Sequence, residues 1–384
     1  MKKRIIVVAD DKIPFLKGVL EPYVEIHYLP GREISPAHMK DADALIIRTR
    51  TKCNKELLDD SKVRFIATAT IGYDHIDTDY CALRNITWQN APGCNSSSVA
   101  QYLLSALLIL SAKKNFMLAG KTLGIIGVGH VGSKVEKVAE RMGMKVLLND
   151  PPRERNENGS RFVSLDQILK ESDIISFHVP LTLSGPDKTF HMADNHFFNN
   201  LGKKTHLINT SRGEIIEEKA LKNAIKSGKL ESVVLDVWGN EPSIDKELSE
   251  MIDIATPHIA GYSLDGKANG TAICIRALSS FFKLDLDNWM PEHMPAPSEN
   301  RIVMDATGKK IQKIISEIIL KTYNILEDDA RFRKSIHSFE EQREQYPLRR
   351  EYGAYTIHIL NDHLDSISVF REMGFNIQKT SQEF

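Results

Sequence analysis

Cysteine is scarce in this chain, and its positions exclude several kinds of site. The 384 residues include four cysteines, Cys53, Cys81, Cys94 and Cys274, and no two of them form a CxxC pair. Disulfide frameworks and structural zinc sites depend on clustered cysteines at characteristic spacings. We therefore predict reduced thiols, no metal site and a cytoplasmic location.

An excess of charge of either sign is also missing. Fifty Lys and Arg residues stand against 51 Asp and Glu residues, which gives a formal net charge of -1. Nucleic-acid-binding domains usually carry a strong basic excess. This balance argues against nucleic acid as a partner.

Long apolar segments are absent as well. The N-terminal segment MKKRIIVVADDK has only five apolar residues before its two aspartates, too few for the core of a signal peptide. The longest apolar stretch, residues 99–112, is interrupted by Gln101, Ser105 and Ser111. It is shorter than the roughly 20 residues of a membrane span, so we predict a buried helix and no membrane partner.

What the sequence does contain is a regular alternation of apolar runs and amphipathic segments. From residue 121 onward the apolar runs are TLGIIGVG, KVLLND, DIISFHV, THLINTS, SVVLDVW and DIATPH. Segments such as SKVEKVAERMG and EEKALKNAIKSGK separate most of them. Strands that alternate with helices predict an α/β fold with a doubly wound parallel sheet of the Rossmann type.

Both ends of the chain predict further units of helices and strands. In residues 1–92 the runs RIIVVAD, ALIIRT and VRFIATAT end in turn residues, as strands of a parallel sheet do. After the Pro-rich segment NWMPEHMPAPSEN, the runs RIVMDA, YTIHIL and FNIQKT alternate with two helical segments. In the first of these helices a helical spacing marks one buried face, formed by Ile311, Ile314, Ile315, Ile318 and Ile319. The C-terminal unit has a size typical of an oligomerisation or regulatory module.

A glycine-rich turn lies between the first of the six strands and the helix that follows it. Gly127, Gly129 and Gly132 form the sequence GVGHVG. Such glycines allow a tight turn, the close approach of a pyrophosphate to the backbone, and close packing of helix on strand. The helix N-terminus at His130 and Val131 offers N–H groups to that anion. We predict a dinucleotide-binding site here.

The kind of dinucleotide depends on the end of the next strand. Asp150 lies 18 residues after Gly132, where a carboxylate accepts hydrogen bonds from a ribose hydroxyl and repels a 2′-phosphate. This favours NAD over NADP. Because Arg153 lies close to Asp150 in the sequence, NADP stays open as the alternative cofactor.

Three residues of complementary chemistry follow three of the predicted strands. Arg212 follows LINTS, Glu241 lies three residues after LDVW, and His258 follows DIATP. The carboxyl ends of parallel strands meet at one edge of a sheet, where ligands bind. We therefore expect these three side chains to lie together beside the nicotinamide.

The three residue types suit the oxidation of a 2-hydroxy acid. An imidazole can take the hydroxyl proton as hydride leaves C2, and a carboxylate on its other nitrogen fixes the tautomer. An arginine can bind the substrate carboxylate bidentately. The structural alternatives are a buried core histidine, a surface arginine and a loop-solvating glutamate. For Asp236, in VVLDVW, two interpretations stay open: a strand-end carboxylate and a group near the nicotinamide.

These motifs together resemble one enzyme family, the NAD-dependent D-2-hydroxyacid dehydrogenases. The segments that carry the resemblance are GVGHVG with Asp150, INTSRG, LDVWGNEP, PHIAG, IGYDHID (71–77) and APGCNSSSVA (91–100). The resemblance covers residues 40–275, approximately. It implies NAD as the cofactor, a Rossmann domain over residues 95–261, and a flavodoxin-like substrate-binding (lid) domain over residues 1–94, to which residues 262–290 return.

Further segments narrow the resemblance to members that oxidise a phosphorylated 2-hydroxy acid. They are RTRTKCN (48–54), TATIGYDHID (68–77), DPPR (150–153) and HIAGYSLDGKANGT (258–271). A C-terminal extension of this size is similar to one that mediates dimerisation, so residues 291–384 are expected to form a homodimer contact.

The resemblance also implies roles for individual residues. It makes Arg212 and Glu241 active-site residues and His258 the acid/base. The implied NAD contacts are Asp150, the backbone at His130 and Val131, Val179, Thr210, Ser211, Arg212, Asp236 and Gly261. The implied substrate contacts are Thr49, Thr70 and Tyr262.

A phosphate on the substrate also requires cations. The sequence nominates Arg48, which precedes Thr49, and as a second candidate the pair Arg349–Arg350. The alternative for that pair is a solvated charge pair. Two other functions also stay open: a different D-2-hydroxyacid dehydrogenase, such as one acting on 3-phosphoglycerate, and a non-catalytic NAD-sensing partner protein.

Overall fold

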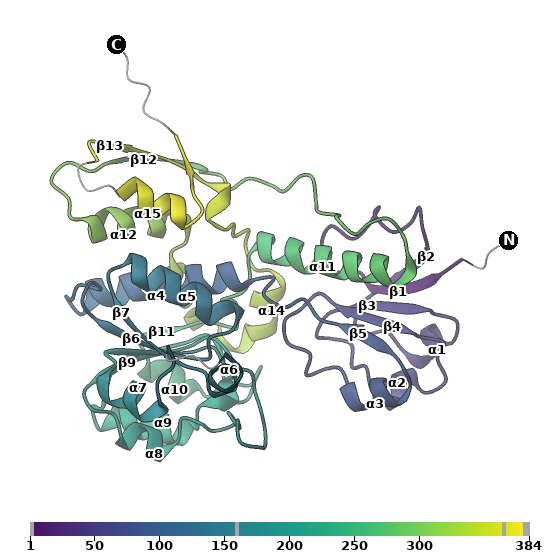
Figure 1. Cartoon of the computed structure of the whole chain (residues 1–384), viewed down its shortest axis with the longest axis horizontal. Coiled ribbons are helices and arrows are strands. Elements are labelled where there is room, and N and C mark those ends of the chain that lie inside the picture. The colour runs from purple at the N-terminus through teal and green to yellow at the C-terminus, as the bar shows by residue number, and fades with distance from the viewer. Residues whose placement is uncertain (1–3, 158–160, 363–365, 379–384) are drawn as a thin grey trace, which may run out of the picture. The chain divides into compact units, whose positions relative to one another are not determined.

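The computed structural model describes residues 4–157, 161–362 and 366–378. The chain divides into two compact units (Figure 1). Unit 1 comprises Met1–Asn95 and Ser263–Pro295, and unit 2 comprises Ser96–Tyr262 and Ala296–Phe384. The C-terminal extension therefore belongs to the same unit as the glycine-rich turn.

Unit 1 is built on a parallel sheet of five strands with the order β2-β1-β3-β4-β5. The strands are β1 (Ile6–Asp10), β2 (Glu25–Leu29), β3 (Ala44–Ile47), β4 (Phe65–Thr68) and β5 (Thr87–Gln89). This order is the flavodoxin-like one, as predicted. The sequence pattern does not predict β2 and β5, because these edge strands are partly exposed and lack a continuous apolar run.

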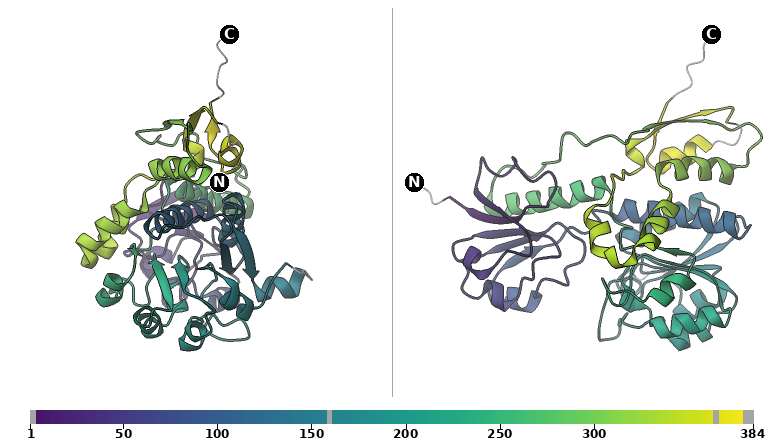
Figure 2. Two further views of the ribbon diagram at one scale, coloured as in Figure 1. Left: turned by 90° about the vertical axis from the view of Figure 1, so that its left-hand side faces the viewer. Right: turned by 180° about the vertical axis from the view of Figure 1, so that it is seen from behind.

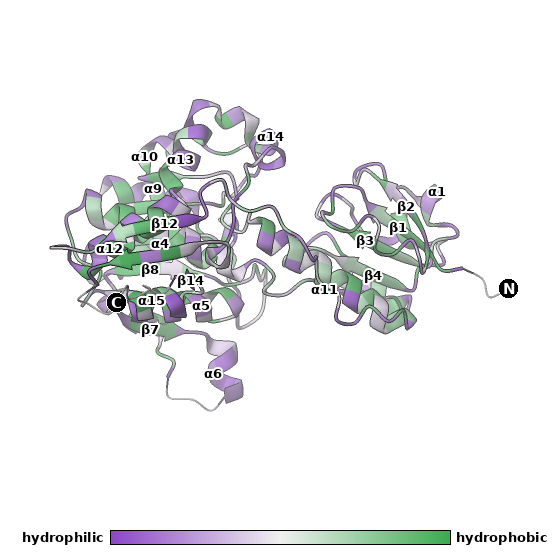
Figure 3. Ribbon diagram, turned by 90° about the horizontal axis from the view of Figure 1, so that it is seen from above, coloured by the Kyte–Doolittle hydropathy of each residue, from purple (hydrophilic) through white to green (hydrophobic). Residues whose placement is uncertain are grey.

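Helix α11 (Leu264–Phe282) returns the chain to this sheet and covers one of its faces (Figure 2). Cys274, Ile275 and Leu278 on α11 pack in one core with Val7 and Ile46 of the sheet. The central strands are coloured hydrophobic in Figure 3, as expected for strands buried on both faces. The remaining helices of unit 1 are α1 (Pro36–Met39), α2 (Lys55–Leu58) and α3 (Thr78–Leu83).

Unit 2 contains a parallel sheet of six strands with the order β11-β10-β9-β8-β6-β7. The strands are β6 (Thr122–Ile126), β7 (Lys145–Asn149), β8 (Ile174–Phe177), β9 (Thr205–Asn209), β10 (Leu230–Leu235) and β11 (Ile254–Ala255). Each of the six apolar runs forms one strand. The doubly wound Rossmann prediction is confirmed.

Helices cover both faces of this sheet (Figure 1). One face carries α4 (Ser96–Lys113) and α5 (His130–Arg141), and the other carries α7 (Leu165–Glu171), α8 (Asn195–Asn199), α9 (Glu218–Lys226) and α10 (Lys246–Met251). Helix α6 (Pro151–Glu157) has no buried residue and is strongly hydrophilic in Figure 3. The short helix η1 (Gly213–Ile215) follows β9.

Helix α4 is the apolar stretch that the sequence marks as a buried helix, and it is buried over most of its length. Its polar interruptions contact the C-terminal extension. The Gln101 amide donates to the carbonyl of Arg350, and the Ser105 hydroxyl donates to that of Tyr323. In the part of the chain that the structure describes, no helix meets the length and hydropathy of a membrane span.

The C-terminal extension forms a small parallel sheet with the order β12-β13-β14. Its elements are β12 (Arg301–Asp305), α12 (Ile311–Thr322), α13 (Ile325–Lys334), η2 (Ile336–Ser338), α14 (Phe339–Glu344), η3 (Tyr352–Ala354), β13 (Thr356–Leu360), α15 (Ser366–Glu372) and β14 (Asn376–Ile377). The predicted isoleucine face of α12 is buried, except that Ile311 is 36% exposed. The sequence pattern does not predict α13 and α14, because few of their residues are apolar and buried, chiefly Ile325, Phe332 and Phe339.

The extension shares a hydrophobic core with helix α4. Ile314, Ile318 and Phe370 pack in the same cluster as Leu103 and Leu107. Burying a side chain of this size contributes about 1.5–3 kcal/mol. The extension is therefore joined to the Rossmann part of unit 2 by apolar packing as well as by hydrogen bonds.

Candidate active site

The glycine-rich turn has the shape that a dinucleotide requires. Gly127 has a φ of 90°, and a Cβ there would lie 2.7 Å from the backbone of His178 and Val179. A Cβ on Gly132 would lie 2.1 Å from the carbonyl oxygen of Gly127, whereas one on Gly129 would meet no described atom within 4 Å. The outer two glycines allow close packing, and the middle one leaves open space at the N-terminus of α5.

The residues around this turn also fit an NAD molecule. Asp150 follows β7, and its carboxylate accepts hydrogen bonds from the N–H groups of Val128 (2.8 Å) and Arg153 (3.1 Å). The Arg153 guanidinium contacts Glu157 and the carbonyl of Val128. The hydroxyl oxygen of Thr210 is buried and has no hydrogen-bond partner among the described residues. A polar ligand at the end of β9 would supply that partner.

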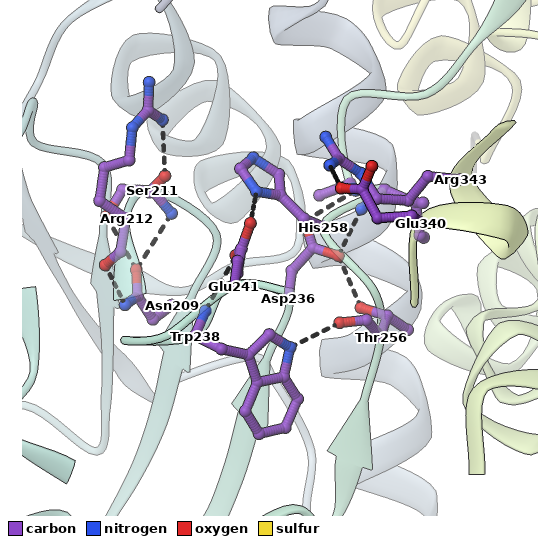
Figure 4. Close-up of polar contacts among 12 residues, drawn as sticks. Asn209, Ser211, Arg212, Asp236, Trp238, Glu241, Thr256, His258, Glu340 and Arg343 are labelled. Carbon is purple, nitrogen blue, oxygen red and sulfur yellow. Dashed lines mark hydrogen bonds and ion pairs between the residues drawn. The ribbon is translucent and has the colours of Figure 1, made fainter. Parts of the chain in front are cut away.

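The structure brings two of the three candidate catalytic residues into direct contact. The Nδ1 atom of His258 lies 2.8 Å from Oε2 of Glu241 (Figure 4). The other carboxylate oxygen of Glu241, Oε1, accepts a hydrogen bond from the N–H of Trp238 at 3.1 Å. These contacts fix the imidazole by its Nδ1 side. Its Nε2 atom is then the ring nitrogen that can exchange a proton with a substrate.

The charge on Glu241 follows from its surroundings. Burial raises the pKa of this carboxyl, but His258, the Trp238 N–H and the Arg343 guanidinium together outweigh burial. The pKa of Glu241 consequently lies below its ordinary value. Glu241 is therefore an anion at neutral pH and accepts a hydrogen bond from Nδ1–H of His258.

Asp236 holds the backbone that carries His258. Its carboxylate is 1% exposed and accepts hydrogen bonds from the Thr256 hydroxyl (2.7 Å) and from the N–H groups of Ile259 and Ala260 (2.8 Å each). Burial raises the pKa of Asp236, although His258 and these hydrogen bonds oppose that effect. His258 has a φ of 56°, and its own N–H donates to the carbonyl of Asp236 at 2.7 Å. These contacts explain how the buried carboxylate of Asp236 is satisfied and how the loop that carries His258 keeps its conformation.

Two residues that support the site were missed by sequence analysis. The indole N–H of Trp238 donates to the carbonyl of Thr256 at 3.0 Å, and the Thr256 hydroxyl lies 2.6 Å from the Tyr102 hydroxyl. Trp238 is 2% exposed. A tryptophan directly before the GNEP turn and a threonine directly before Pro257 were the only sequence signals for this arrangement.

Arg212 lies on the loop after β9. Its Nη1 donates to the carbonyl of Ser211 (2.8 Å), and its own carbonyl accepts from the Asn209 amide (2.8 Å). A Cβ on Gly213 would lie 1.9 Å from the carbonyl carbon of Trp238, so the two loops pack backbone to backbone. Figure 4 shows the Arg212 side chain extending beyond the strand ends, as the His258 side chain also does.

The predicted substrate residues are divided between the two units. In unit 1, Arg48 and Thr49 directly follow β3, and Thr70 follows the neighbouring strand β4. Arg48 pairs with buried Asp10 (Nε to Oδ2, 3.3 Å), and the Thr70 hydroxyl donates to the carbonyl of Gly72. In unit 2, the Tyr262 ring is 5.8 Å from that of Tyr346. Contact of these residues with one substrate stays a prediction.

The structure excludes one of the two alternatives that the sequence suggests for the Arg349–Arg350 pair. The two residues are 5% and 7% exposed, so they are not a solvated charge pair. The Arg349 guanidinium donates to the carbonyls of Ser98 and Ala260 and to Gln101, and lies 3.8 Å from the ring centroid of Tyr323. The donors of Arg349 are used inside unit 2, which assigns it a structural role.

Comparisons with known proteins place this site in a family. The model of the NAD-binding domain of D-isomer specific 2-hydroxyacid dehydrogenases matches residues 110–260, and a domain of unknown function, DUF3410, matches residues 293–371. Erythronate-4-phosphate dehydrogenases from Bacteroides thetaiotaomicron and Escherichia coli are 51% and 37% identical to this chain. The alignments cover 91% and 96% of this chain and 98% of each relative. The chain belongs to the erythronate-4-phosphate dehydrogenase family.

Solved structures of related enzymes agree with this membership. The D-lactate dehydrogenase of Aquifex aeolicus, solved with NAD and lactic acid, is 28% identical with a TM-score of 0.60, covering 73% of this chain and 96% of that one. The NAD-bound 3-phosphoglycerate dehydrogenase of Entamoeba histolytica is 25% identical with a TM-score of 0.61, covering 76% and 100%. Members of the erythronate-4-phosphate dehydrogenase family are NAD-dependent oxidoreductases, and NAD is the cofactor of this chain.

Proposed function

We propose that this protein oxidises 4-phospho-D-erythronate to (R)-3-hydroxy-2-oxo-4-phosphooxybutanoate with NAD, a step of pyridoxine 5′-phosphate biosynthesis. The contact that carries this proposal is the hydrogen bond between Glu241 and His258 at the strand ends, with Arg212 on the neighbouring loop. The substrate is suggested by the names of the relatives, which match this chain over nearly their whole length. A cytoplasmic location is part of the proposal.

Each of the three side chains has one task in this reaction. NAD, when bound, accepts the hydride from C2 of the substrate. His258 takes the hydroxyl proton at Nε2, and the Glu241 carboxylate stabilises the imidazolium that results. Arg212 binds the substrate carboxylate and polarises the forming carbonyl. We propose that Thr49, Thr70, Tyr262 and Arg48 contact the rest of the substrate.

The proposal is tested by comparing substrates. The purified protein is incubated with NAD and, separately, with 4-phospho-D-erythronate, D-erythronate, 3-phospho-D-glycerate and D-lactate, while NADH absorbance is followed. We expect the highest kcat/KM for 4-phospho-D-erythronate. A higher value for 3-phospho-D-glycerate would support a 3-phosphoglycerate dehydrogenase, and no turnover of any substrate would support an NAD-sensing partner protein.

We also propose that the protein is a homodimer formed through residues 291–384. On the small sheet, Val303 of β12 is 58% exposed and Leu360 of β13 is 36% exposed, and both strands bury their alternate residues on the opposite face. A second copy that packs against this sheet face would bury both side chains. The other face already packs against α12.

Light scattering after gel filtration tests the dimer. We expect twice the chain mass of 43.3 kDa, and about one chain mass when Val303 and Leu360 are both replaced by Asp. Leu83→Asp is the matched control, because Leu83 is 76% exposed but lies in unit 1. A monomeric unmodified protein would exclude this part of the proposal.

A further inference from the structure

An arginine of the C-terminal extension lies beside the candidate catalytic pair. Arg343 is in the last turn of α14, and its side chain is 18% exposed. The guanidinium carbon lies 5.5 Å from the ring centroid of Tyr262 and 5.7 Å from that of Phe339. Its charge acts on Glu241, whose pKa it helps to lower. No sequence motif predicts a role for Arg343.

The position of Arg343 is fixed by the packing of its helix. Phe339, one turn earlier on α14, is 1% exposed, and its ring lies 5.9 Å from the ring of Phe332. Phe332 in turn contacts Trp238 at 6.0 Å between ring centroids. Trp238 donates its N–H to Glu241. A chain of three aromatic side chains therefore ties α14 to the loop that carries Glu241.

The contacts of Arg343 leave part of its hydrogen-bonding capacity unused. Nη1 reaches Oε1 of Glu340 at the long distance of 3.5 Å, and Nε is buried without a hydrogen-bond partner in the described residues. The oxygens of Glu241 and Asp236 bind other groups of the chain, as described above. A partly buried guanidinium whose Nε–H is buried and unbonded is suited to an anionic ligand.

The arrangement of the two arginines indicates which anionic group of the substrate Arg343 can bind. Figure 4 shows Arg212 and Arg343 on opposite sides of the Glu241–His258 pair. A 2-hydroxy acid with a terminal phosphate carries an anion on each side of its reacting carbon. If Arg212 binds the carboxylate and His258 faces the C2 hydroxyl, the phosphate end extends toward Arg343.

We infer that Arg343 binds the terminal phosphate of the substrate and makes the site selective for phosphorylated 2-hydroxy acids. This inference rests on the proposed function. It assigns to the C-terminal extension a part in substrate recognition, in addition to its packing on α4. It also names Arg343 in place of Arg349, whose guanidinium donates to carbonyl groups inside unit 2.

The test compares substrates with and without the phosphate. Arg343→Gln should lower kcat/KM for 4-phospho-D-erythronate by about 10- to 100-fold, as expected for a lost charge-assisted hydrogen bond. The value for D-erythronate, which lacks the phosphate, should change by less than about threefold. Arg343→Lys, which keeps the charge, should give an intermediate value. Lys334→Gln is the control, because Lys334 is an exposed cation of the same extension.

Three outcomes would overturn the inference. An equal loss for both substrates, with a shifted pH profile, would show that Arg343 acts through Glu241 and His258. An unchanged kcat/KM for both substrates would show that Arg343 does not take part in substrate binding. A lowered melting temperature in Arg343→Gln, with normal discrimination in the well-folded Arg343→Lys variant, would show a structural role.

A second measurement does not depend on the identity of the substrate. Binding of inorganic phosphate to the protein in the presence of NAD is followed by calorimetry for the unmodified chain, Arg343→Gln and Lys334→Gln. We expect at least about tenfold weaker binding for Arg343→Gln alone. Equal phosphate affinity in all three would overturn the inference even if the protein oxidises another substrate, whereas failure to oxidise 4-phospho-D-erythronate by itself overturns only the proposed function.

Discussion

Replacing His258 by asparagine is expected to lower kcat for substrate oxidation by about 10²- to 10⁴-fold, the usual contribution of a general base. Asparagine cannot take the hydroxyl proton that Nε2 accepts. It does tolerate the φ of 56° at this position, since it is one of the residues enriched in the left-handed region. The N–H of residue 258 can still donate to the carbonyl of Asp236. The loss should therefore fall on catalysis and not on folding.

A matched control exists for this substitution. His191 is an exposed histidine of unit 2 that also has a positive φ, of 52°, so His191→Asn makes the same chemical change in the same backbone conformation. We expect unchanged kcat in the control, and unchanged NAD affinity by calorimetry in both variants. A His258→Asn protein with nearly full kcat would mean that another group accepts the proton.

Replacing Glu241 by glutamine is expected to lower kcat by about 10²-fold or more, because the amide removes the charge that stabilises the imidazolium. The amide can also donate to Nδ1 of His258 and so favour the wrong tautomer. Glu218→Gln is the control. Glu218 accepts a hydrogen bond from the N–H of Gly239, close to the same loop, and glutamine keeps an acceptor oxygen there. We expect its kcat to change little.

The same substitution has a pH-dependent effect on stability. The pKa of Glu241 is lowered in the folded protein, so its ionisation stabilises the fold above the unfolded-state pKa. This contribution is lost as the pH falls through the lower, folded-state value. Urea unfolding should therefore show the largest difference between the unmodified protein and Glu241→Gln near neutral pH, and a shrinking difference in acid. A difference that grows in acid would contradict the assigned direction of the pKa shift.

Much of the site could be predicted because it depends on local sequence. The turn GVGHVG must contain glycine, since a Cβ at Gly127 or Gly132 would overlap backbone atoms a few ångströms away. Parallel strands place their carboxyl ends at one edge, so residues that follow β9, β10 and β11 are brought together by topology alone. That rule led from three separate segments to Arg212, Glu241 and His258.

Other parts of the site depend on contacts that no local pattern encodes. The sequence leaves Asp236 as either a strand-end carboxylate or a cofactor contact, and only the structure shows that three groups beyond β11 donate to its oxygens. Arg349 and Arg343 lie six residues apart in a polar segment and look alike in sequence. One is enclosed by α4 and Tyr323, and the other lies beside Tyr262 and Glu241.

The sequence by itself determined the class of the two larger sheets, the position of the glycine-rich turn and the three candidate catalytic residues, because hydrophobic period and strand-end chemistry are local properties. Only the tertiary structure decided that the C-terminal extension packs on α4 and that Phe339 places Arg343 beside the candidate catalytic pair. The contacts of the extension with α4, such as that between Ser105 and Tyr323, and the contact between Phe332 and Trp238 join residues about 90 positions or more apart in the chain. Which distant side chains meet is settled by packing.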